Sequence, residues 1–220
     1  IFSAITDADM VTKFFDKIGI LLNILIAYPY LKGQSFKLTD TYRRMINLLY
    51  LDSGAYSAFM GKSTIDVYGY LHYLNSYGRK YNGCFNLDDR FDNPDHNLLH
   101  QLYLEKGLLN TDTLPIPVVH DSINPFEEFE MYAGMGHSYI AIGSSGSSAL
   151  KDQLLTQARE KYPDVKVHLF GDLERNILKK HRPFSADSAS WAHNAGVGVI
   201  NYWRSSENKS YRYNVGGRDS

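Results

Sequence analysis

Two aspartates, Asp52 and Asp187, each stand at the end of a short apolar run, and small residues follow each of them. Apolar runs of this length are typical of strands buried in a parallel sheet. The carboxyl ends of such strands are where α/β barrels carry their catalytic groups. A carboxylate held there can act as a nucleophile or transfer a proton, because its surroundings set its pKa. The two aspartates therefore predict an enzyme.

The elements that would position these aspartates follow from the alternation of short apolar runs with amphipathic stretches, a pattern typical of parallel strands covered by helices. Eight strands are predicted, at residues 21–28, 47–52, 84–88, 115–120, 138–143, 166–171, 184–187 and 196–202. With 220 residues, 44% of them hydrophobic, the chain can bury one large core. We therefore predict a single α/β domain over residues 1–220, a compact (β/α)8 TIM-type barrel, with an open doubly wound sheet as the alternative.

Two of the intervening helices have clear start signals. Asn93 precedes Pro94 and Asn124 precedes Pro125, and a cap residue followed by proline is typical of a helix N-terminus. The helix after Asn93 is predicted to bury one apolar face, formed by Leu98, Leu99 and Leu102.

In a barrel the strand ends would gather polar and small residues around one mouth, namely Asp52, Asp88 or Asp89, His120, Gly143, Gly171 and Asp187. Three carboxylates there could divide the roles of nucleophile, proton-transfer group and acceptor of hydrogen bonds from a ligand. Residues 143–148, Gly-Ser-Ser-Gly-Ser-Ser, would form a loop whose glycine lets a ligand approach the backbone. The alternatives are solvated loop carboxylates and a plain turn.

Charge and cysteine content add weaker constraints. A formal net charge of -1 and a pI near 6.8 provide no global field to attract a polyanion. The single cysteine, Cys84, excludes an internal disulfide and a multi-cysteine zinc site, which favours a reducing, cytoplasmic setting. The apolar run 18–31 contains Gly19, Asn23 and Pro29 and is too short for a membrane span. We expect no membrane association and no secretory signal; trimming at the start stays open, because no initiator Met is present.

Cationic residues and histidines form two further patterns. Lys179, Lys180 and Arg182 cluster before the strand that carries Asp187, and Arg204 belongs to a basic final segment. They could hold nucleic-acid phosphates, or they could be a solvated helix end and tail. His96 and His100, four apart on a predicted helix, could share a metal, but the sequence pattern offers no third ligand nearby, so no metal is predicted.

The order of several motifs resembles that of the queuine-type tRNA-guanine transglycosylases and of their phage relatives that place 7-deazaguanines in DNA. Residues 52–56, Asp-Ser-Gly-Ala-Tyr, resemble the family's Asp-Ser-Gly-Gly-Phe/Tyr segment, in which the aspartate contacts the base and the aromatic ring stacks on it. Residues 86–89, Asn-Leu-Asp-Asp, resemble a strand ending in an aspartate that binds guanine.

The later motifs follow in the same order, and the resemblance spans residues 47 to about 202. Residues 139–143, Tyr-Ile-Ala-Ile-Gly, are similar to the family's Ala-Ile-Gly-Gly loop, and residues 168–171, His-Leu-Phe-Gly, to its Tyr-Leu-Met-Gly strand. Residues 184–188, Phe-Ser-Ala-Asp-Ser, fall where the family has its Phe-Asp-Cys nucleophile segment. The resemblance therefore implies that Asp187 is the attacking carboxylate.

The resemblance also implies roles for the other residues. Asp52 and Asp88 would be the further catalytic groups. The base would contact Ser53, Gly54, Tyr56, Asp89, His120, Gly143, Ser144, Phe170 and Gly171. A packed aromatic is the alternative for Tyr56, and a buried structural histidine for His120.

The chain departs from the tRNA enzymes at several positions. Ala55 and Ser144 replace the second glycine of two motifs, and His120 replaces a strand-end glutamine. The cysteine cluster that binds zinc is absent, and residues 188–191, Ser-Ala-Ser-Trp, replace a Pro-Thr-Arg segment. The phage DNA-modifying branch is therefore the nearer resemblance.

The implied reaction is base exchange. Asp187 would attack C1′ of a guanosine residue and expel guanine, and a 7-deazaguanine of the preQ0 or preQ1 kind would then replace it, with no cofactor. The expected partners are DNA or tRNA and the free base, and accessory proteins are compatible with this. Two other classes of protein also fit the sequence. One is a glycosidase or nucleoside hydrolase that uses the same carboxylates with water, and the other is a non-catalytic nucleic-acid-binding barrel.

Overall fold

The computed structural model describes residues 2–4, 8–31, 43–109, 114–120, 124–143, 147–171, 174–188, 198–207 and 209–214. Eight strands form one curled sheet in the order β4-β3-β2-β1-β8-β7-β6-β5, and each pair of neighbours is parallel. The strands are β1 (Phe2–Ala4), β2 (Leu22–Ala27), β3 (Ile46–Asp52), β4 (Gly83–Cys84), β5 (Val118–Val119), β6 (Tyr139–Ile142), β7 (Lys166–Leu169) and β8 (Ser185–Ser188). The predicted α/β class is confirmed.

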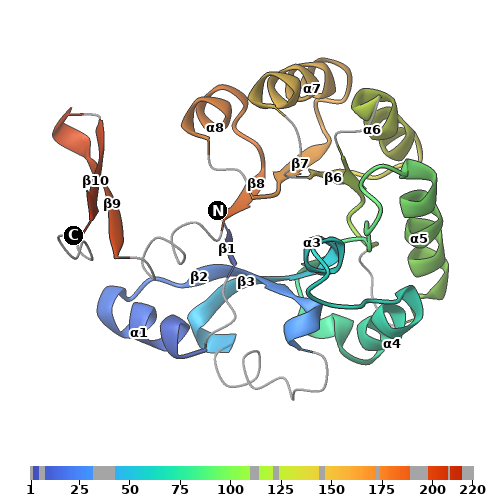
Figure 1. Cartoon of the computed structure of the whole chain (residues 1–220), viewed down its shortest axis with the longest axis horizontal. Coiled ribbons are helices and arrows are strands. Elements are labelled where there is room, and N and C mark those ends of the chain that lie inside the picture. The colour runs from blue at the N-terminus through green and yellow to red at the C-terminus, as the bar shows by residue number, and fades with distance from the viewer. Residues whose placement is uncertain are drawn as a thin grey trace.

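Helices surround the outer face of the curled sheet (Figure 1). They are α1 (Ala8–Ile18), α4 (Val67–Tyr77), α5 (Pro94–Gly107), α6 (Pro125–Gly134), α7 (Ser148–Lys161) and α8 (Arg175–His181). The short helix α3 (Ala55–Phe59) instead lies within the ring of strands in Figure 1. Asn93 caps α5 as predicted, since its side chain accepts a hydrogen bond from the His96 backbone N–H at 3.0 Å. Asn124 precedes α6, which begins at Pro125. Among the helices described, none combines the length and the apolar character needed to cross a membrane.

The sheet is open between its edge strands, β4 and β5. There, among the residues that the structure describes, the pairing is reduced to one parallel bridge between Phe85 and Ile116. The backbone N–H of Ile116 donates to the carbonyl of Cys84 at 2.8 Å, and that of Asn86 donates to the carbonyl of Ile116 at 2.9 Å. The two edges therefore touch at one point without a continuous ladder.

Side chains along each strand point alternately to the outer and the inner face of the sheet, so they belong to separate hydrophobic clusters. In β2, Ile24 and Ile26 pack outward in a cluster with residues of α1 and α4, whereas Leu25 joins an inner cluster with Phe2 and Phe85. Because successive side chains of a strand point to opposite faces, the register of each strand also decides which polar groups enter the concave side. In β8, Ala186 packs outward, so its neighbours Ser185 and Asp187 face inward.

The predicted eighth strand, residues 196–202, was wrong. The chain there forms β9 (Val199–Arg204), which pairs antiparallel with β10 (Lys209–Asn214) in a separate two-stranded sheet. This hairpin lies beside the curled sheet in Figure 1. The place in the sheet belongs to β1, between β2 and β8, where Phe2 pairs with Asp187 and Ser3 with Ile24. A three-residue strand is too short to show the periodicity by which strands are recognised.

Candidate active site

Three carboxylates from separate strands come together on the concave side. Asp52 ends β3, Asp88 follows β4, and Asp187 lies within β8; the last two are each 6% exposed. Burial raises the pKa of Asp52 to about 7, and the negative charges of Asp88 and Asp187 add to this rise. Backbone hydrogen bonds from Gly54 and Ser53 oppose it. A carboxyl that titrates near neutral pH can both give and take a proton there.

Asp187 is held by one residue of β7 and one residue that follows this strand. The backbone N–H of Gly171 donates to Asp187 Oδ1 at 2.9 Å, and His168 Nε2 lies 3.4 Å from the same oxygen. His168 is fully buried, and its Nδ1 is hydrogen-bonded to Ser185 Oγ at 2.6 Å. Burial lowers the pKa of His168, although Asp187 opposes the shift, so the ring is neutral at pH 7. Asp187 is therefore held by two polar groups, neither of which carries a positive charge.

Asp88 lies in a second set of hydrogen bonds. His120 Nε2 donates to Asp88 Oδ2 at 2.6 Å, and Ser53 Oγ donates to Oδ1 at 3.4 Å. The His120 ring stacks on Phe91, with centroids 4.3 Å apart and an interplanar angle of 28°. His120 is 5% exposed, and Ser53 is fully buried. The carboxylate is thus oriented by a histidine whose own position is fixed.

Glu128, on α6, completes the surroundings of His120. Its Oε2 accepts a hydrogen bond from the His120 backbone N–H at 3.2 Å, and burial raises the pKa of Glu128 to about 7. Gly143 packs close to Nδ1 of the ring, because an added Cβ would lie 2.5 Å from His120 Nδ1. Sequence reasoning missed Glu128, because an acidic residue in the first turn of a helix is also expected from the helix dipole.

The turn after Asp52 depends on a glycine. Gly54 has φ +83, and an added Cβ would lie 2.4 Å from Pro29 Cδ. The turn leads into α3, where Tyr56 is 57% exposed. Tyr56 is therefore not the packed aromatic that was the alternative reading, and its ring is accessible.

The remaining predicted base contacts have different positions. Asp89 points toward α5, with Oδ1 3.1 Å from His96 Nε2 and 3.5 Å from His100 Nδ1. Phe170 packs in the inner aromatic cluster, 4.6 Å between ring centroids from Phe85 and the same from His168. Ser144 lies outside the described residues.

The predicted phosphate-binding cations are not brought together with the carboxylates. Because α8 leads from the carboxyl end of β7 back to the amino end of β8, Lys179, Lys180 and Arg182 lie at the edge of the sheet opposite Asp187. Lys180 Nζ binds Asp152 at 2.6 Å. Arg204, on β9, is paired with Glu207.

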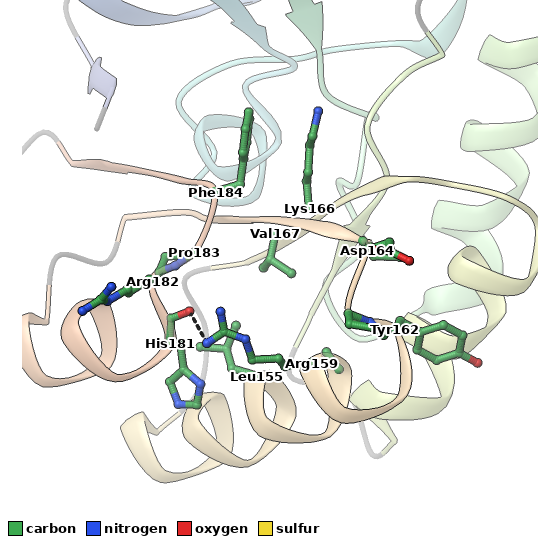
Figure 2. A pocket seen from close by; sticks show the side chains of 13 residues that line it. Leu155, Arg159, Tyr162, Asp164, Lys166, Val167, His181, Arg182, Pro183 and Phe184 are labelled. Atoms are coloured by element: carbon green, nitrogen blue, oxygen red, sulfur yellow. Dashed lines mark hydrogen bonds between the residues drawn. The ribbon is translucent and has the colours of Figure 1, made fainter.

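A cavity of about 250 Å³ opens at this opposite edge (Figure 2). The loops before β7 and β8 line it, together with the end of α7. Arg159 donates to the carbonyl of His181 at 3.1 Å, and Lys166 Nζ lies 4.8 Å from the centroid of the Phe184 ring. This cavity is separate from the carboxylate cluster and takes no part in the chemistry considered below.

The fold and the site together define an α/β protein with three converging carboxylates at the carboxyl edge of a curled parallel sheet. No protein-family model, curated protein or solved structure matches the chain.

Proposed function

We propose that the chain is a base-exchange glycosyltransferase that replaces guanine in a nucleic acid by a 7-deazaguanine through a covalent aspartyl intermediate. The observation that carries the proposal is the convergence of Asp52, Asp88 and Asp187, in which one carboxyl has a pKa of about 7. The motif order that resembles the guanine transglycosylases supports the same reaction. We further propose that the curled sheet acts as a (β/α)8-type barrel, joined at its seam by the Phe85 and Ile116 bridge.

Asp187 is the proposed nucleophile. The two contacts described above, from Gly171 and from His168, are made with Oδ1, so Oδ2 is the oxygen proposed to attack C1′. The bond between C1′ and N9 of guanine breaks as the ester bond to Asp187 forms, as in retaining glycoside chemistry. The neutral imidazole of His168 leaves the carboxylate charge available for the attack.

Asp52 is the proposed acid and base. With a pKa of about 7, a large fraction of its carboxyl is protonated at neutral pH and can give that proton to the departing guanine. The incoming 7-deazaguanine then loses its N9 proton to the Asp52 carboxylate and attacks C1′. This second step breaks the ester and regenerates the Asp187 carboxylate. The proton taken from the incoming base replaces the one that Asp52 gave to guanine, so bonds and protons balance without a cofactor.

Asp88 is the proposed acceptor for the N–H groups of the base. Its orientation by His120 and Ser53 suits a carboxylate that must receive a hydrogen bond in a fixed direction. Tyr56, exposed at the start of α3, would stack on a base, which is worth about 1–3 kcal/mol for nucleic-acid bases on aromatic rings. DNA is the favoured polymer, because the departures from the tRNA enzymes point to the DNA-modifying branch.

The test is a search for the covalent intermediate and the released base. Wild type and Asp187→Asn are incubated with end-labelled duplex DNA, single-stranded DNA and tRNA, and denatured samples are resolved by electrophoresis while free guanine is measured by chromatography. The proposal predicts a protein-linked label and free guanine with the wild type only. Absence of both with all three polymers, from correctly folded protein, contradicts it.

A further inference from the structure

We propose that Asp89, His96 and His100 form a binding site for a divalent transition metal, with Zn²⁺ the first candidate. One possible ligand atom from each residue lies within 4.8 Å of the other two. Asp89 Oδ1 is 3.1 Å from His96 Nε2, and the centroids of the two imidazole rings are 4.2 Å apart. Two imidazoles and one carboxylate are a ligand set that zinc and similar metals accept.

The local structure explains why the two histidines converge. Side chains four residues apart lie on one face of a helix, and both residues belong to α5. The cap at Asn93 fixes where the helix begins, so His96 is in the first turn and His100 one turn later. The sequence pattern showed this pair but not its third member, since Asp89 reaches it from the loop before the helix.

The loop that carries Asp89 is attached to α5 by hydrogen bonds that do not involve the three candidate ligands. Asn97, 1% exposed, donates through Nδ2 to the carbonyl of Arg90 at 2.8 Å and accepts at Oδ1 from the Arg90 N–H at 3.3 Å. The Asn86 side chain donates to the carbonyl of Asn97 at 2.9 Å. These contacts hold the carboxylate opposite the histidines, and such preorganisation reduces the entropy lost on binding.

The distances suit a metal of the size of zinc. Two ligand atoms that are each about 2.0–2.1 Å from zinc at a tetrahedral angle lie about 3.3 Å apart, close to the 3.1 Å between Asp89 and His96. His100 Nδ1 lies 2.9 Å from the carbonyl of Leu87. A proton on Nδ1 would donate to that carbonyl and leave the lone pair on Nε2, as is usual for a metal-binding histidine. Because Nδ1 is the nitrogen that lies 3.5 Å from Asp89 Oδ1, the His100 ring would turn its Nε2 toward the other two ligands when a metal binds.

The cluster is accessible from solvent, with side-chain exposures of 35% for His96, 23% for Asp89 and 16% for His100. A metal held by three protein ligands at such a place keeps a position for water. The neighbouring Asp88 belongs to the carboxylate cluster, so an ion on Asp89 would also fix the loop that carries Asp88. This consequence rests on the proposed function, whereas metal binding itself does not.

The test measures metal binding and not activity. Tag-free protein is treated with a chelator, dialysed, and titrated with Zn²⁺ near pH 7.5 by calorimetry. We expect one ion per chain, and a rise in Tm of at least about 5 °C at a hundredfold excess over Kd. Failure of wild type to bind one ion overturns the proposal, whatever the outcome of the base-exchange tests.

Variants assign the ligands. His96→Ala, His100→Ala and Asp89→Asn should each weaken binding by at least about tenfold. His72→Ala, which removes an exposed histidine from α4, should bind as wild type does. Should the alanine variants misfold by circular dichroism, the isosteric Asp89→Asn decides. Unchanged affinity in Asp89→Asn, or an equal loss in His72→Ala, contradicts the assignment.

Discussion

Asp88 and Asp89 are neighbours in sequence, yet Asp88 is bound by His120 at 2.6 Å on the concave side of the sheet, whereas Asp89 lies 3.1 Å from His96 on α5. One loop thus divides two adjacent carboxylates between two clusters. Sequence alone could not separate them, because the direction of a side chain in a loop follows from contacts made far along the chain. Here those contacts come from His120, beyond β5, and from α5.

The contact between His120 and Gly143 provides a first prediction. A Cβ at position 143 would lie 2.5 Å from His120 Nδ1, so Gly143→Ala should push the ring away from Asp88. We expect base exchange to fall at least about tenfold, the loss of roughly 1.4 kcal/mol of transition-state stabilisation. Steady-state kinetics with labelled guanine measure it. Gly134→Ala, at a position open to an added Cβ, is the control, and equal rates in the two variants would refute the packing argument.

The raised pKa of Asp52 predicts how stability depends on pH. The folded protein holds this proton up to about pH 7, whereas the unfolded chain loses it near the ordinary value of 3.8. Between pH 3.8 and about pH 7 the folded state therefore binds more protons than the unfolded state. The stability that Asp52 contributes is greatest below pH 3.8 and falls as the pH rises through this range. Glu128, whose pKa is also raised to about 7, acts in the same direction.

Asp52→Asn should accordingly raise the free energy of unfolding at pH 8 by about 2–4 kcal/mol, at about 1.4 kcal/mol per pKa unit, and should leave it almost unchanged at pH 4. Urea unfolding at both pH values measures this. Asp152→Asn is the matched control, since the hydrogen bond from Lys180 lowers the pKa of Asp152 and its removal should not stabilise. A variant that is no more stable than wild type at pH 8 would rule out the raised pKa.

Two glycines with similar backbone conformations provide a third prediction. Gly54 has φ +83 and Gly61 φ +68, but only an alanine at position 54 would meet Pro29, at 2.4 Å. Gly61→Ala should cost about 1 kcal/mol from the left-handed conformation alone, and Gly54→Ala about 3 kcal/mol because overlap is added. Equilibrium unfolding in urea compares them. Equal losses would mean that the turn after Asp52 is not packed as described.

The fourth prediction concerns Tyr56. Because its side chain is 57% exposed, Tyr56→Ala should leave Tm within about 2 °C of wild type, as surface substitutions usually change stability by less than about 0.5 kcal/mol. If the ring stacks on a base, the same variant should raise KM for the nucleic acid about tenfold, and Tyr56→Phe should not. Initial rates over a range of polymer concentrations distinguish them. An unchanged KM in Tyr56→Ala would remove Tyr56 from the binding surface.

Much of the sheet was predictable, because its buried strands are short runs of large apolar residues. Seven of the predicted runs overlap strands of the sheet. The assignment of residues 196–202 failed because pairing partners are not visible in local sequence, and β9 pairs with β10. The three residues of β1 show no pattern of their own.

The buried face of α5 was predicted correctly only for Leu98, which packs partly buried against a core cluster. Leu99 and Leu102 are 66% and 42% exposed, whereas Asn97, Gln101 and Leu104 are buried. Hydrogen bonds explain the inversion: Gln101 Nε2 donates to the carbonyl of Pro115 at 2.6 Å, and Asn97 holds the loop at Arg90. Polar side chains that form hydrogen bonds inside the protein can be buried, and an apolar periodicity does not predict this.

The rule that catalytic groups lie at the carboxyl ends of parallel strands predicted where the carboxylates lie. It did not predict which residues form hydrogen bonds with them or with their neighbours. Asp52, Asp88 and Asp187 are brought together, as expected of groups at the carboxyl edge of a parallel sheet. His168 enters the site through the alternation of β7, and Glu128 through the face that α6 turns inward. Both depend on the packing of whole elements, which no motif encodes.

In the proposed reaction, Asp187 carries the sugar while one base leaves and another enters. Wild type and Asp187→Asn, matched in Tm, are incubated with isotope-labelled guanine and with duplex DNA or tRNA, and the label in the polymer is counted. We expect incorporation by wild type into one polymer and none by Asp187→Asn. Incorporation by both proteins would exclude Asp187 as the nucleophile, and release of guanine without incorporation by wild type would show a hydrolase instead of a base-exchange enzyme.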